Sequence, residues 1–69
     1  MNQIGPQVRV LRLKADMTQE ELAARCNLVG FSISRSTLGK IESQVRRITD
    51  DEVALLAKAL RVSIGDLYK

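Results

Sequence analysis

Two short segments carry the pattern of a helix capping box, and they constrain the fold more than any other feature of the chain. Residues 18–21 are Thr-Gln-Glu-Glu and residues 49–52 are Thr-Asp-Asp-Glu. In such a box the threonine hydroxyl accepts a bond from the backbone N–H of the glutamate, and the glutamate carboxylate accepts one in return from the threonine N–H. Each segment therefore predicts the start of a helix. Met17 and Leu22 flank the first box with the spacing of a hydrophobic staple.

Three further helices are expected from caps and apolar spacing. A proline suited to a first helical turn, followed by apolar residues at helical spacing, predicts a helix over about residues 6–15. Ser34 can cap an amphipathic helix that runs to residue 42, and Ser63 can cap a last short helix through Leu67. No useful stretch alternates as a strand does. The chain is therefore expected to be all-α, a compact bundle of five helices.

The length and the residue types limit the number of domains and the kinds of catalytic or metal-binding site that the chain can form. With 69 residues, we expect residues 1–69 to form a single domain, with residues 1–5 as a flexible N-terminal end or arm. One cysteine excludes an internal disulfide, and the lack of histidine excludes a zinc site and histidine-based catalysis. Because no paired catalytic carboxylates or activated nucleophile can be assembled, we expect no enzyme activity, no metal and no cofactor.

Several binding classes are also disfavoured. No apolar run approaches the length of a membrane span, and no signal peptide is present, so a cytoplasmic protein with no membrane partner is expected. Cys26 then stays reduced and is predicted to be a small core residue rather than a redox sensor. Phe31 and Tyr68 are the only aromatic residues, too few for binding single-stranded nucleic acid by base stacking.

Basic side chains are concentrated in one stretch. The formal net charge is +3, and residues 34–47 contain four basic residues and one acidic residue. A local positive patch is typical of phosphate binding. The helix that starts at Ser34 places Leu38 and Ile41 on one face and polar or basic residues on the other. Such a helix can lie in the major groove of DNA, or it can be a solvated helix of some other small bundle.

Four groups of residues, taken in order, resemble the Cro/repressor type of helix-turn-helix proteins, the Xre family. They are Thr-Gln-Glu-Glu-Leu-Ala at 18–23, Ser-Arg-Ser-Thr-Leu at 34–38, Lys-Ile-Glu at 40–42, and Ala-Leu-Leu-Ala-Lys-Ala-Leu-Arg-Val-Ser at 54–63, continuing to Asp66-Leu67. The resemblance covers nearly the whole chain. It implies a lambda-repressor-like domain in which the second helix crosses the DNA backbone and the third enters the major groove.

The resemblance also implies roles for single residues. Arg35, Ser36 and Lys40 match the exposed positions that face DNA base edges. For Arg35 the alternative is a phosphate contact or a solvated surface charge, and for Lys40 it is a phosphate contact. For Ser36 the alternative is a residue that only helps to satisfy the helix start. Arg12 and Glu42 match a structural salt bridge between helices 1 and 3.

Four residues are candidates for contacts with DNA phosphates. Gln19 matches the phosphate-contacting glutamine at the start of helix 2, and Arg46 and Arg47 match the loop after the recognition helix. Thr37 is a further candidate, with a bond to its own helix end as the alternative.

The chain departs from the family pattern in front of the third helix. In the family the turn between helices 2 and 3 is tight, whereas here about five extra residues lie within residues 27–33. Helix 2 ends at Asn27, or it runs on through Leu28 and stops at Gly30. Gly39, in mid-helix, either gives room for DNA or the longer turn, or is an ordinary exposed glycine.

The expected function is sequence-specific binding of double-stranded DNA by a repressor-like transcriptional regulator, acting as a homodimer on a near-palindromic operator. Ile64, Leu67 and Tyr68 are candidates for the dimer contact. Alternatively, Leu67 closes the core while Tyr68 covers it. A protein-interaction module of the same fold, as in an antitoxin or adaptor, is the alternative function. No small-molecule effector is evident.

Overall fold

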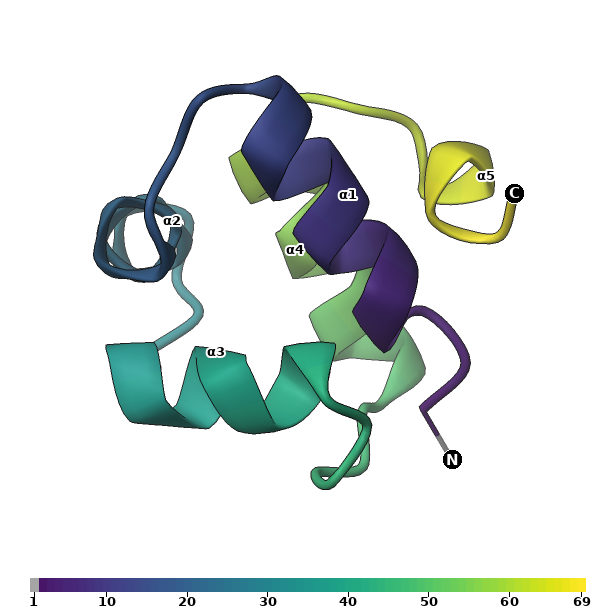
Figure 1. Ribbon diagram of the computed structural model, residues 1–69, viewed down its shortest axis with the longest axis horizontal. Coiled ribbons are helices and arrows are strands. Elements are labelled where there is room, and N and C mark those ends of the chain that lie inside the picture. The colour runs from purple at the N-terminus through teal and green to yellow at the C-terminus, as the bar shows by residue number, and fades with distance from the viewer. Residues whose placement is uncertain (1) are drawn as a thin grey trace.

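Five α-helices make up the computed structural model, which describes residues 2–69 and has no β-strand among them. The helices are α1 Gly5–Lys14, α2 Gln19–Leu28, α3 Arg35–Glu42, α4 Asp50–Leu60 and α5 Ile64–Leu67 (Figure 1). The all-α five-helix fold predicted from the sequence is confirmed. Within residues 2–69, no helix combines the length and the apolar character that crossing a bilayer requires.

Both threonine capping boxes form. Thr18 Oγ1 accepts from Glu21 N at 3.1 Å, and Glu21 Oε1 accepts from Thr18 N at 2.9 Å. The same pair of bonds joins Thr49 and Glu52 at 3.2 and 3.0 Å. A third box of this kind opens α5. The helix starts are thus local features that the sequence alone specifies.

Helices α1 to α4 all end in a Schellman motif, in which a residue with positive φ turns the chain out of the helix. After α2 this residue is Gly30, with φ of 93°, and Phe31 N donates across it to Cys26 O at 2.8 Å. The corresponding positions after α1, α3 and α4, with φ of 56°, 67° and 59°, are held by Asp16, Gln44 and Arg61. Only the end of α2 therefore has a glycine at this position, the residue that adopts a positive φ most easily.

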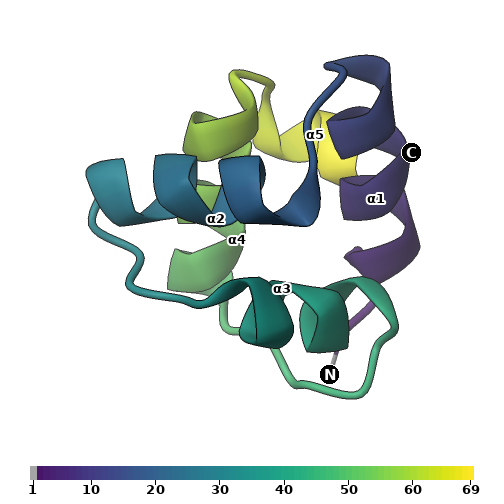
Figure 2. The same ribbon diagram turned by 60° about the vertical axis from the view of Figure 1, so that its left-hand side comes forward.

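The core lies between α1, α2 and α4, with α3 across one end and α5 at the side. α3 packs against α1 and α2, and α5 packs against α4. Figures 1 and 2 both show α3 below the other long helices, with one side facing away from them. The largest fully buried side chains are Ile4, Val8, Leu22, Cys26, Leu38, Ile41, Leu56 and Leu67. The core thus anchors α3 along one side only.

Residues 2–5 are packed against the bundle and do not form the free arm that we expected. Ile4 is buried in the core. The backbone at Gly5 comes so close to α3 that an added Cβ would collide with the carbonyl oxygen of Ile41. Asn2 is hydrogen-bonded to the same carbonyl at 2.7 Å. These partners lie far along the chain, so local sequence signals could not show them. Residue 1, also part of the expected arm, lies outside the described residues.

Candidate nucleic-acid interface

The inner side of α3 is anchored and its outer side is exposed. Ser34 Oγ accepts from Thr37 N at 3.1 Å and so caps the helix start. Leu38 and Ile41 are completely buried, whereas Ser36 and Lys40 are exposed. Residues four apart lie on the same helix face, so Ser36 and Lys40 form one outward surface. The helix is held from behind and presents this surface to the surroundings.

The structure brings the three predicted base-contact residues onto the exposed part of α3. Arg35 lies in the first turn, beside Ser36, and Lys40 lies one turn further on; all three are exposed. Neither Arg35 nor Lys40 forms an ion pair with another residue of the described chain. Ser43, the residue directly after α3, continues the same face and donates its hydroxyl to Lys40 O at 3.3 Å.

Behind this face, Arg12 and Glu42 form a buried ion pair with two contacts. The distances are 2.7 Å from Arg12 Nε to Glu42 Oε2 and 3.1 Å from Arg12 Nη2 to Glu42 Oε1. Arg12 Nη1 also donates to Met17 O at 2.8 Å, and Gln19 Nε2 donates to Glu42 Oε1 at 3.1 Å. A single carboxylate of α3 is therefore bonded to α1 and to the start of α2. Every buried side-chain polar atom among the described residues has a hydrogen-bond partner.

Gln19, the predicted phosphate contact of α2, is half-buried and has one amide hydrogen in use. Its Nε2 donates to Glu42, which leaves the second N–H of the same nitrogen for another acceptor. The amide lies beside Gly39, where an added Cβ would stand 3.6 Å from Nε2. This is ordinary van der Waals contact, so neither Gln19 nor the backbone requires a glycine there.

The two arginines after α3 differ in their surroundings. Arg46 makes two bonds to Glu52 at 3.0 and 2.9 Å and a third to Arg47 O at 2.8 Å. The hydrogen bond from Arg46 holds the pKa of Glu52 below its usual value, and Glu52 raises the pKa of Arg46 in return. Arg46 is thus committed to the start of α4, which sequence reasoning missed. Arg47 is exposed and has no ion-pair partner within residues 2–69.

Thr37 is bonded to its own helix start. The hydroxyl of Ser34 donates to Thr37 Oγ1 at 3.1 Å, and Thr37 is half-buried. The arrangement matches the alternative role that the sequence left open for this residue. Its own hydroxyl hydrogen remains for an acceptor outside the helix.

The enlarged turn between α2 and α3 has an ordered path. Helix 2 was expected to end at Asn27 or to run on through Leu28. The structure shows the second, because α2 runs through Leu28 and the chain turns at Gly30. Asn27 Nδ2 donates to Ala23 O at 2.8 Å and to Ile33 O at 2.9 Å, and Phe31 is buried. In Figure 2 the connection leaves the end of α2 and runs down to the start of α3. Side-chain bonds from α2 therefore support the segment that leads into α3.

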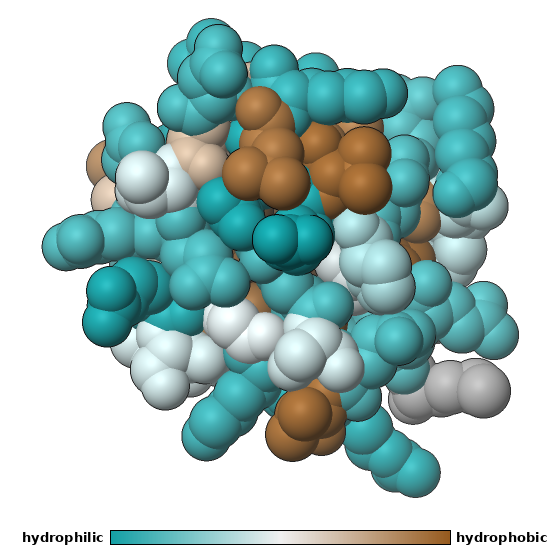
Figure 3. All heavy atoms as spheres, viewed as in Figure 1, coloured by the Kyte–Doolittle hydropathy of each residue, from teal (hydrophilic) through white to brown (hydrophobic). Residues whose placement is uncertain are grey.

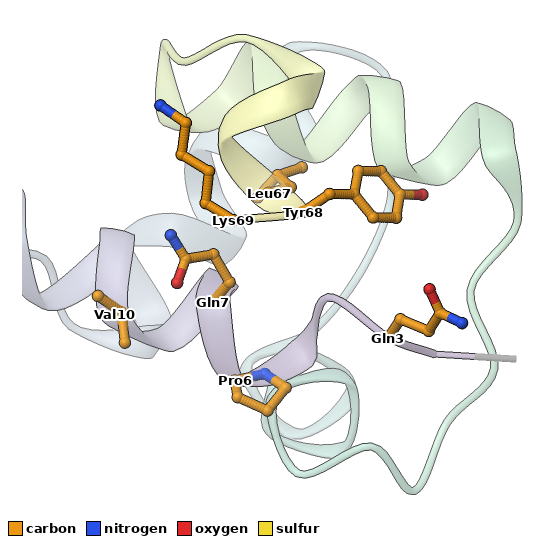
Figure 4. Close-up of a pocket in the computed structure, with 7 residues that line it drawn as sticks. All are labelled: Gln3, Pro6, Gln7, Val10, Leu67, Tyr68 and Lys69. Atoms are coloured by element: carbon orange, nitrogen blue, oxygen red, sulfur yellow. The ribbon is translucent and has the colours of Figure 1, made fainter.

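Of the three candidates for a dimer contact, Leu67 takes the alternative place that the sequence left open for it, in the core. It is only 1% exposed, because α5 turns it into the core, whereas Ile64 and Tyr68 are 48% and 54% exposed. A hollow of about 240 Å³ lies between the start of α1 and the C-terminal end of the chain. Its lining, drawn in Figure 4, consists of Gln3, Pro6, Gln7, Val10, Leu67, Tyr68 and Lys69. Val10 and Leu13 of α1 are also exposed apolar side chains. Figure 3 shows a group of apolar side chains on the upper part of this face of the molecule.

Cys26 is a core residue of α2. It is completely buried, and burial raises the pKa of its thiol to about 11. A protonated, inaccessible thiol is a poor nucleophile and a poor target for oxidation.

A short helix held across the end of a bundle, with basic side chains on its free face and in the next loop, defines a helix-turn-helix protein, the class of DNA-binding regulators of transcription. The sequence model of the helix-turn-helix family matches residues 8–67, and the chain belongs to this family. It is 38% identical to Control protein C.BamHI of Bacillus amyloliquefaciens over 64 residues, which are 91% of this chain and 73% of that protein. No solved structure gives a significant match. The predicted resemblance to Xre-type proteins is confirmed, and the family is one of regulators rather than of enzymes.

Proposed function

We propose that the protein regulates transcription by binding a near-palindromic DNA operator as a homodimer. The observation that carries this proposal is the outer face of α3, where Arg35, Ser36 and Lys40 are exposed on a helix that Leu38 and Ile41 anchor from behind. An α-helix fits the major groove of B-DNA, where each base pair displays a distinct set of donors and acceptors. Access to an operator also requires the cytoplasmic location that we predicted.

The exposed side chains of α3 then have different tasks. Arg35 donates two bonds to O6 and N7 of a guanine, which discriminates by about 1–3 kcal/mol against other bases. Ser36 is small, so it lets the helix approach and bonds one base edge. Lys40, one turn further along, reaches a base or a phosphate.

Contacts with the DNA backbone set the register. Arg47 is exposed in the loop after α3, and the second amide N–H of Gln19 is available at the start of α2. Both can donate to phosphate oxygens, as can the hydroxyl of Thr37. Arg46 contributes by holding the loop, since its guanidinium is occupied by Glu52. Because phosphate contacts release counterions, binding weakens steeply as salt rises.

The dimer is proposed to form through the side of the molecule that carries α5. Ile64 and Tyr68 are exposed there, and Tyr68 also lines the hollow drawn in Figure 4. A two-fold dimer of such domains places two recognition helices about one DNA turn apart, roughly 34 Å. Selection of bound sites from random DNA would report this spacing directly.

The role assignment is tested by comparing Arg35→Ala with Arg47→Ala on the selected operator and on random DNA. We expect Arg35→Ala to lose about 1–3 kcal/mol of binding free energy on the operator and little binding free energy on random DNA. Arg47→Ala should weaken binding to both and lower the slope of log affinity against log salt by about one. Lys58→Ala removes the same charge from the last turn of α4 and serves as the control.

Two results would contradict the proposal. Equal losses on operator and random DNA for both arginine variants would overturn the assignment of roles. No salt-sensitive binding of the wild-type protein to any site would favour a protein-interaction module of the same fold.

A further inference from the structure

The carboxamide of Asn2 joins the start of α1 to the end of α3. Its Oδ1 accepts from Ile4 N at 3.2 Å and from Gly5 N at 2.9 Å, where α1 begins. Its Nδ2 donates to Ile41 O at 2.7 Å and to Arg46 O at 3.1 Å. Both N–H groups and the oxygen of one side chain are therefore in use.

Two further contacts reinforce the same joint. Gln44 Nε2 donates to Asn2 O at 3.0 Å, so the backbone of Asn2 also holds the loop. Gly5 packs directly against the carbonyl oxygen of Ile41, at a distance that leaves no room for a Cβ. The N-terminal segment thus acts as a support beneath the end of the recognition helix and the loop that follows it.

The loop of residues 43–48 is held from both sides. On one side Arg46 pairs with Glu52 at the start of α4. On the other side Asn2 bonds the backbone of Arg46 and the end of α3. Arg47 lies next to both supports, and its own side chain is exposed.

We propose that Asn2 is a positioning residue for DNA binding, which holds the loop after α3 so that Arg47 meets a backbone phosphate. This inference rests on the proposed function. The guanidinium of Arg47 is on a long flexible side chain, so the precision of its contact depends on its backbone. A loop that is already ordered loses less conformational entropy on binding. Asn2 touches no DNA in this scheme and acts through Arg46 and Arg47.

The substitution Asn2→Ser tests the bonds to α3 and the loop separately from the bonds to the start of α1. A serine hydroxyl can also accept from backbone N–H groups two or three residues further on, so it can still accept from the start of α1. It lacks the pair of amide donors that reach Ile41 O and Arg46 O. Asn2→Asp serves as a second variant, because one carboxylate oxygen can still accept from the start of α1 while the other, in place of the amide nitrogen, faces the carbonyl oxygens of Ile41 and Arg46 without a hydrogen to donate. Ala59→Gly lowers helix stability in the last turn of α4, away from the loop, and is the control for a loss of stability alone.

Affinity is measured on the operator and on random DNA over a range of salt concentrations, at a temperature at which all variants are folded. We expect Asn2→Ser to lower the affinity for the operator and the affinity for random DNA by about fivefold each, the effect of roughly one lost hydrogen bond. The salt slope should fall by about one, with the ratio of operator to random affinity unchanged. Asn2→Asp should show a larger loss, and Ala59→Gly should bind as the wild type does.

A second readout needs no DNA. Backbone amide relaxation by NMR should show residues 43–48 more mobile in Asn2→Ser, with α2 and α4 unchanged. An unchanged loop would overturn the inference, as would a mobile loop with wild-type affinity and salt slope. If the wild-type protein itself binds no DNA, the proposed function fails and this inference fails with it. Normal wild-type binding with an unaffected Asn2→Ser variant removes the inference alone.

Discussion

At the scale of single residues, Glu42 connects α3 to two other helices. Its carboxylate accepts from Arg12 of α1 and from Gln19 of α2, and both Arg12 and Glu42 are buried. Such a pair is not an efficient source of stability, since removing two charges from water is expensive. Its effect is geometric, because the bonds that satisfy the charges also fix the orientation of α3 relative to α1 and α2.

Breaking this pair on one side should be severe. Glu42→Ala leaves the Arg12 guanidinium buried without its counter-charge, and we expect the free energy of unfolding to fall by about 3–5 kcal/mol. Urea denaturation followed by circular dichroism measures this loss. The double variant Arg12→Met/Glu42→Leu removes both charges and should recover most of it. A Glu42→Ala protein as stable as the wild type would contradict this account.

Gly39 offers a test that separates stability from function. An alanine there would make only ordinary contact with Gln19. We expect Gly39→Ala to raise the free energy of unfolding by about 0.5–1 kcal/mol, because glycine is a poor residue inside a helix. If affinity for the operator falls while stability rises, the glycine provides room for DNA. If affinity is unchanged, the glycine has no role in binding. A loss of stability would show that the alanine side chain does not fit.

The sequence predicted single-residue roles best where the partner was part of a known pattern. Arg12 and Glu42 were paired through the family resemblance, and the structure shows them 2.7 Å apart. The partner of Arg46 was missed because Glu52 already had a place in a capping box, and a residue pattern does not reveal a second role. Asn2 was missed because its partners are 39 and 44 positions away.

At the scale of elements, each helix start with a capping box depends on an ionised carboxylate. The backbone N–H of Thr18 is the main cause that lowers the pKa of Glu21, and the Arg46 hydrogen bond is the main cause for Glu52. A carboxylate whose pKa is lower in the folded state stabilises the protein above its unfolded pKa. That contribution is lost as the pH falls through the folded pKa.

The Glu52→Gln variant should therefore differ from the wild type in a pH-dependent way. Near pH 7 we expect it to be less stable by about 0.5–1 kcal/mol, since it loses a charged partner for a partly exposed Arg46. The difference should shrink as the pH falls below 4.5, the ordinary pKa of Glu52. Thermal unfolding between pH 3 and pH 7 measures it. A difference that stays constant over this range would show that ionisation of Glu52 does not matter.

The elements themselves were predicted well because their signals are local. The capped starts of α2, α3 and α4 follow from three or four neighbouring residues. The path between α2 and α3 was left open because it depends on the Asn27 amide reaching Ile33 O and on burial of Phe31. Neither can be deduced from turn chemistry alone.

At the scale of the whole molecule, one core serves all five helices. Cys26 lies in this core and is completely buried, so it reports on opening of the whole domain. Because burial raises its thiol pKa to about 11, the folded protein keeps the thiol protonated between pH 7 and pH 9. Small single domains of this kind unfold cooperatively in most cases.

Labelling of Cys26 by a thiol reagent should therefore require unfolding. With a typical stability of about 5 kcal/mol, we expect the native rate at pH 8 to be roughly a thousandfold or more below that in urea. The logarithm of the rate should rise linearly with urea, with the slope of global unfolding. A fast rate that is insensitive to urea would mean that the end of α2 opens locally.

The residues with positive φ at the helix ends affect which mutations this protein can accept during evolution. Arg61 and Asp16 adopt a conformation that costs an ordinary residue about 1–2 kcal/mol, and both lie on the surface. A glycine at either site would relieve that cost without altering the core or the outer face of α3. The effects of distant substitutions on the free energy of unfolding are nearly additive. The chain thus has accessible mutations that compensate for destabilising changes on the outer face of α3, which widens the range of substitutions that this face can accept.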